Sequence, residues 1–120
     1  MLRYKLIGAV IGGVLLAGCS GHSAEQDDGW DMIVAEDYSN ARAHYQSLLA
    51  DDPNNPYVNL NLGVAYEELG DLEMAAKHYQ VALANGEDVE INEVARDGNT
   101  AGRNTTVADV AQENLNTLGS

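Results

Sequence analysis

The chain has 120 residues, which is the size of one small domain. It is strongly acidic, with 19 Asp and Glu against 6 Lys and Arg and a formal net charge of −13. Such a chain repels phosphate backbones, which excludes nucleic acid as a partner. The acidic charge by itself indicates only that the chain is kept soluble. The single cysteine, Cys19, excludes an intramolecular disulfide.

The N-terminal segment, residues 1–18, has the layout of a secretion signal. A basic head containing Arg3 and Lys5 precedes an uncharged, mainly apolar run over residues 6–17, and small residues follow. The run is shorter than the about 20 apolar residues that a membrane-spanning helix needs. We therefore predict a signal peptide over residues 1–18.

A four-residue motif ends this run: Leu16, Ala17, Gly18 and Cys19. It resembles the lipobox of bacterial lipoproteins, in which the cysteine sulfur accepts a diacylglyceryl group. The resemblance implies lipidation of Cys19 with fatty acids such as palmitate, and each buried methylene contributes about 0.8 kcal/mol to anchoring. Ser20 replaces the Asp that retains such proteins at the inner membrane, so we expect the outer membrane, facing the periplasm. The alternative is an ordinary secreted protein cleaved nearby.

Residues 19–28 are small and polar, and we predict a flexible tether there. The remainder, 29–120, contains an internal repeat, because residues 40–50 match residues 74–84, with His44 opposite His78. Apolar residues recur at helical spacing over residues 57–69 and 72–84. The sequence therefore predicts helical pairs.

A 34-residue period resembles the tetratricopeptide repeat (TPR), a pair of antiparallel helices called A and B. Leu62 and Gly63 match the Leu-Gly pair of helix A, and Asn59 replaces an early bulky residue of the family. Further matches are the turn and the aromatic and small sites at Tyr66, Gly70, Asp71, Ala75, Tyr79 and Ala82. The resemblance implies an all-α fold with a full repeat over residues 56–88 and a partial repeat over 29–55, in which Gly29 occupies the position of Gly63.

After about one and a half repeats the pattern stops. Residues 89–105 are rich in glycine and polar residues, and we predict mostly loop. Apolar residues then return at helical spacing from Val107 to Leu118, behind a capping Thr106. We predict a cap helix over residues 106–118, which covers the apolar face that the last repeat would expose.

The sequence contains no motif for a nucleophile, a phosphate-binding loop or a metal site. His44 and His78 are equivalent residues of successive repeats, about one repeat translation apart, which is too far for shared metal ligation. We therefore predict no enzyme, no cofactor and no bound metal.

The TPR resemblance also implies a concave groove lined by helix A. An apolar strip rimmed by acids suits an amphipathic or basic segment of a protein or peptide partner. The alternative is that the N-terminal segment or the cap helix fills the groove. The exposed groove positions carried over from the family are Tyr57, Leu60, Asn61, Val64, Glu67 and Glu68.

These features predict a protein-interaction module held at a membrane through its lipid anchor. The chain is similar to small TPR lipoproteins that assist assembly of an envelope complex such as a pilus or secretion system. The alternative is a structural envelope-maintenance subunit that completes its helical stack on a partner protein. A bare apolar face of helix A left open at the N-terminal end of the stack would favour this alternative.

Overall fold

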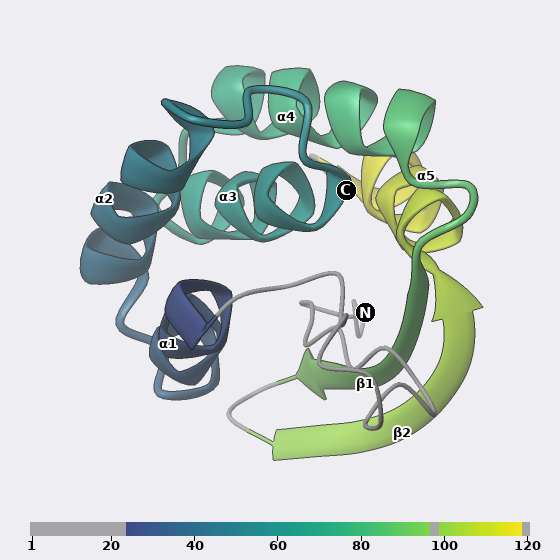
Figure 1. Cartoon of the computed structure of the whole chain (residues 1–120), viewed down its shortest axis with the longest axis horizontal. Coiled ribbons are helices and arrows are strands. Elements are labelled where there is room, and N and C mark those ends of the chain that lie inside the picture. The colour runs from purple at the N-terminus through teal and green to yellow at the C-terminus, as the bar shows by residue number, and fades with distance from the viewer. Residues whose placement is uncertain (1–23, 97–98, 119–120) are drawn as a thin grey trace.

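The computed structural model describes residues 24–96 and 99–118, and the side chains of residues 28–91 and 104–118 within them. Cys19, the predicted signal peptide and the start of the predicted tether lie outside the described residues. The fold is all-α apart from one small hairpin of strands (Figure 1). Its elements are α1 (Ala24–Val34), α2 (Tyr38–Leu49), α3 (Pro56–Glu68), α4 (Leu72–Asn85), β1 (Glu90–Arg96), β2 (Asn99–Thr106) and α5 (Val107–Thr117).

Two helical hairpins, α1–α2 and α3–α4, have the same turn. The Asp37 N–H donates to the Met32 carbonyl at 2.9 Å, and at the equivalent place in the second hairpin the Asp71 N–H donates to the Tyr66 carbonyl at 2.9 Å. Glu36 and Gly70 lie at the same place in the two turns, and both have positive φ, 60° and 90°. The first repeat thus has a complete helix A. The prediction of about one and a half repeats underestimated the extent of this repeat. Residues 24–28, predicted as tether, begin that helix.

Each pair of helices crosses at a glycine. A Cβ at Gly63 would lie 2.6 Å from the ring of Tyr79, and a Cβ at Gly29 would lie 2.5 Å from the ring of Tyr45. Both tyrosines are 0% exposed, so neither ring has free space to move into. Any larger residue would therefore force the two helices apart.

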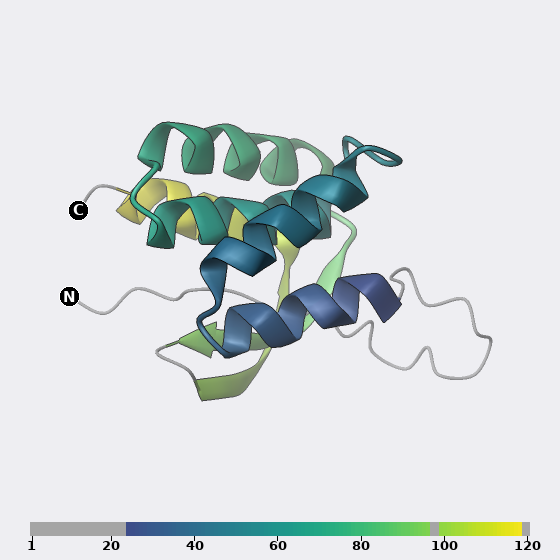
Figure 2. The ribbon, with the colours of Figure 1, turned by 90° about the vertical axis from the view of Figure 1, so that its left-hand side faces the viewer.

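The predicted cap helix is present as α5. It packs on α4, and its buried face contains Val107, Val110 and Ala111. Thr106 caps the helix, since its hydroxyl oxygen accepts a hydrogen bond from the Asp109 N–H at 3.1 Å. Figure 2 shows α5 alongside the second hairpin, where a further helix A would lie in a longer stack.

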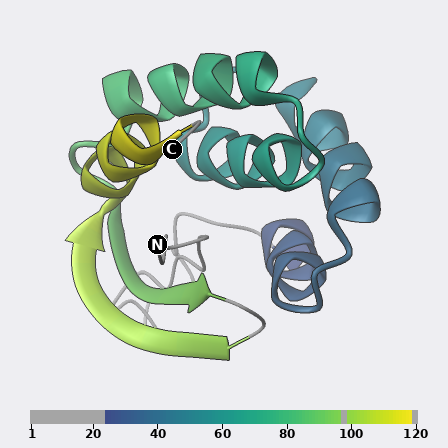
Figure 3. The same ribbon diagram turned by 180° about the vertical axis from the view of Figure 1, so that it is seen from behind.

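The loop predicted over residues 89–105 is instead a β-hairpin. β1 pairs with β2 in antiparallel fashion, from Glu90 opposite Thr106 to Arg96 opposite Asn99. The Val107 N–H donates to the Val89 carbonyl at 2.8 Å, so the hairpin leaves and rejoins the helical stack at one point. It contacts α5 and α1, and Figure 3 shows it arching between them across the concave side. Among the described residues, no helix is long and apolar enough to cross a bilayer.

Candidate functional site

The predicted groove on α3 is closed. Four of its six residues are 0–3% exposed: Tyr57, Leu60, Asn61 and Val64. The prediction that they are exposed is therefore wrong. The physical reason is that α3 packs against four helices, α1, α2, α4 and α5, which cover its faces. Glu67 and Glu68 are half-buried.

Glu67 is engaged inside the stack. The Tyr79 hydroxyl donates to its Oε1 at 2.8 Å. Burial, followed by the charge of Glu67, raises the pKa of Tyr79 well above its ordinary value. Glu67 was predicted as an exposed acid on the rim of the groove, but in this structure its carboxylate accepts a hydrogen bond from a core tyrosine.

Asn59, which replaces the family's bulky residue, forms a buried polar link. Its Nδ2 donates to the carbonyls of Pro53 and Asn55 at 3.1 and 2.9 Å. Its Oδ1 is therefore the acceptor that faces His78, whose Nδ1–H donates at 2.9 Å. One amide thus ties the α2–α3 loop to α3 and α4, a role that the TPR pattern did not indicate.

Tyr66 is the contact through which α2 docks onto the second repeat. Its hydroxyl accepts from Gln46 Nε2 at 2.6 Å, and the guanidinium of Arg42 lies 5.9 Å from its ring centroid. The ring also stacks on His78, with centroids 5.4 Å apart and planes 5° from parallel. Burial, followed by the charge of Lys77, lowers the pKa of His78 from 6.5.

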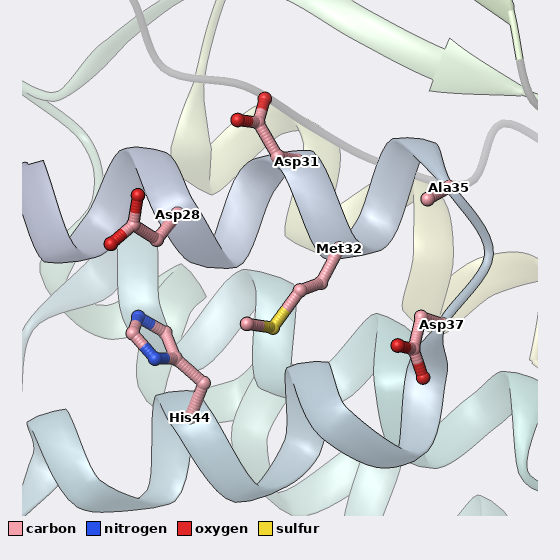
Figure 4. A pocket seen from close by; sticks show the side chains of 6 residues that line it. All are labelled: Asp28, Asp31, Met32, Ala35, Asp37 and His44. Carbon is pink, nitrogen blue, oxygen red and sulfur yellow. The ribbon is translucent and has the colours of Figure 1, made fainter.

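The first repeat has an open pocket of about 400 Å³. At the equivalent place in the second repeat, α2 packs on α3. We call the surface around it the end surface. Figure 4 shows Met32 pointing from α1 towards α2, with Asp28 and Asp37 at opposite ends. Its lining residues are Asp28, Asp31, Met32, Ala35, Asp37 and His44.

The sequence prediction missed the end surface as a site. The repeat offset could have found it, because it places Asp28 and Asp31 at the positions of Leu62 and Ala65. Acids at apolar positions of a repeat indicate a face that no neighbouring repeat covers. Within the described side chains, no group of three His, Cys, Asp or Glu lies close enough to hold a metal ion.

Helical hairpins that recur at a fixed period, cross at a glycine and stack side by side define a class of α-helical repeat proteins. The family model described as tetratricopeptide repeat matches residues 29–90, which is more than half of the chain. The chain therefore belongs to the tetratricopeptide repeat family. No curated protein and no solved structure matches it. The family typically provides non-catalytic scaffolds for protein–protein interaction.

Proposed function

We propose that this chain is a lipid-anchored TPR module that binds a protein partner at a bacterial envelope membrane. Its role there is to assist assembly of an envelope complex such as a pilus or secretion system. The observation that supports this most is the combination of a TPR match over residues 29–90 with a lipobox-like motif ending at Cys19. The expected location is the outer membrane, on the periplasmic side.

The short distance between the motif and the fold supports a role close to the membrane. α1 begins at Ala24, five residues after Cys19. An extended chain spans at most about 3.6 Å per residue, so a lipid on Cys19 would hold the start of α1 within about 18 Å of the anchor. The end surface, built mainly on α1, is then the part of the stack nearest the bilayer.

Metabolic labelling with a fatty acid tests the anchor. The wild-type chain is expected to take up labelled palmitate and to fractionate with membranes. Cys19→Ala is expected to do neither, because the acyl chains need the cysteine sulfur. Ser20→Ala is the matched control and should be labelled like the wild type. An unlabelled wild-type chain would remove lipid anchoring from the proposal.

The end surface favours a second candidate function, that of a structural subunit that completes its helical stack on a partner. A partner at the end surface leaves the α3 face closed, whereas a peptide in the groove has to separate α3 from the helices packed on it. Hydrogen exchange of α3 amides, measured with and without the partner, separates the two. Unchanged protection supports stacking, and faster exchange supports groove binding.

A further inference from the structure

The two repeats present equivalent surfaces, one covered and one open. In the second repeat, Leu62 and Ala65 are 0% exposed and Tyr66 is 8% exposed, and α2 packs on α3 there. In the first repeat the equivalent residues are Asp28, Asp31 and Met32, and they line the open pocket. The turns of both repeats have the same hydrogen bonds, so the backbone at this end follows the same course.

The covered surface shows what geometry the open one accepts. Its cover is a helix, α2, which presents Arg42 and Gln46, one turn apart, to the ring of Tyr66. The His78 ring stacks on Tyr66, and His44 is its equivalent in the pocket. A helix that approached the end surface as α2 approaches α3 would bring residues equivalent to Arg42 and Gln46 over Met32.

The open surface is more acidic than the covered one. Two apolar positions are carboxylates, Asp28 and Asp31, and both are exposed, as is Asp37. Met32 replaces the rigid Tyr66 with a flexible apolar side chain, which adapts to different partners. The surface therefore complements a helix that has Lys or Arg around a small apolar centre.

From this comparison we infer that the end surface docks an amphipathic α-helix with a basic face, supplied by the partner protein. The helix lies against α1 and α2 as α2 lies against the second repeat. This inference rests on the proposed function, because it names the chemistry of that partner. A second copy of the chain is the weaker occupant, since each copy has a formal net charge of −13 and the two repel.

The probe is a peptide made from α2, the helix that covers the equivalent surface of the second repeat. It spans residues 38–50 with Ser39→Lys and Gln46→Lys, so that three cations, including Arg42, share one face. Asn40→Lys and His44→Asp, on the opposite face, are joined by a lactam that holds the peptide helical and reduces the entropy lost on binding. Two control peptides replace the three cations with Glu or disrupt the helix with Ala43→Pro.

Binding to the full chain is measured by fluorescence anisotropy at about 0.1 M salt. The basic helical peptide is expected to bind at least about tenfold more tightly than either control peptide. Asp28→Lys with Asp31→Lys should weaken it about tenfold, since two charge pairs become repulsive. Glu87→Lys with Asp88→Lys makes the same change in net charge at exposed positions beyond α4, and should weaken it less than about threefold.

Equal binding of the three peptides, or equal weakening by both charge reversals, would overturn the inference, because the attraction would then be non-specific. Sedimentation equilibrium of the chain alone gives the remaining outcome. A dimer that Asp28→Lys with Asp31→Lys dissociates would assign the surface to a second copy and overturn it as well. The proposed function fails separately, on fatty-acid labelling, so the two failures are distinguishable.

Discussion

A small set of polar contacts orients the two repeats at the scale of single residues. Asn61 Nδ2 donates to the Tyr45 hydroxyl at 3.2 Å, and both side chains are 0% exposed. The Tyr79 hydroxyl donates to Glu67. Buried polar groups cost free energy unless they are paired, so these bonds favour one arrangement of the helices over others.

Gly63 tests how closely the helices approach. Without neighbours, Gly63→Ala would stabilise a helix by about 1 kcal/mol. Here the new Cβ would lie 2.6 Å from the Tyr79 ring, so we expect the free energy of unfolding to fall by about 1–3 kcal/mol instead. Urea denaturation checks this. A variant as stable as the wild type, or more stable, would contradict the close crossing of α3 and α4.

His78 makes stability depend on pH. Burial and Lys77 lower its pKa in the fold, so the unfolded chain binds this proton at higher pH than the folded chain does. The contribution of His78 to the free energy of unfolding is complete above the unfolded pKa of 6.5. It is lost as the pH falls towards the lower folded pKa. His78→Gln keeps a donor for Asn59, and we expect its free energy of unfolding to fall less between about pH 7.5 and pH 5 than that of the wild type. Urea denaturation at each pH gives the free energies of unfolding of the two chains. An equal fall with pH in both would contradict the assignment of this pH dependence to His78.

At the scale of elements, helices were predictable and strands were not. Helical periodicity and caps marked α3, α4 and α5, because one stripe of each helix packs against its neighbours. α1 was understated because its apolar stripe is interrupted by Asp28 and Asp31, which face an open pocket. The hairpin was predicted as loop because Gly98, Gly102 and polar residues dominate residues 89–105, while the pairing that makes it a hairpin is a tertiary property.

The hairpin behaves as an insertion in the stack. Its two ends meet at the hydrogen bond between Val107 N–H and the Val89 carbonyl, so replacing residues 91–104 with Gly-Gly should leave α4 and α5 packed. We expect helical circular dichroism to persist and the free energy of unfolding to fall by about 2–3 kcal/mol, since the buried Ile91 is lost. Loss of cooperative thermal unfolding would show that the helices need the hairpin in order to stack.

At the scale of the whole molecule, the fold class followed from the sequence and the site did not. The repeat offset and a few small and aromatic positions sufficed for the family. The groove was assigned from the family's usual open concave side, but this short stack closes that side with its own elements. Among the described residues, the N-terminal end is accessible, and there α1 presents acids instead of a packed neighbour.

The most direct test of a lipid-anchored binding module is site-specific photo-crosslinking in intact cells. The cross-linking residue replaces Ala35, which is exposed in the end surface, or Ala84, an exposed control on α4. We predict an adduct with one envelope protein from position 35, none from position 84, and loss of the adduct when Cys19 is also replaced by Ala. An adduct that persists without Cys19, or the same adducts from both positions, would contradict it.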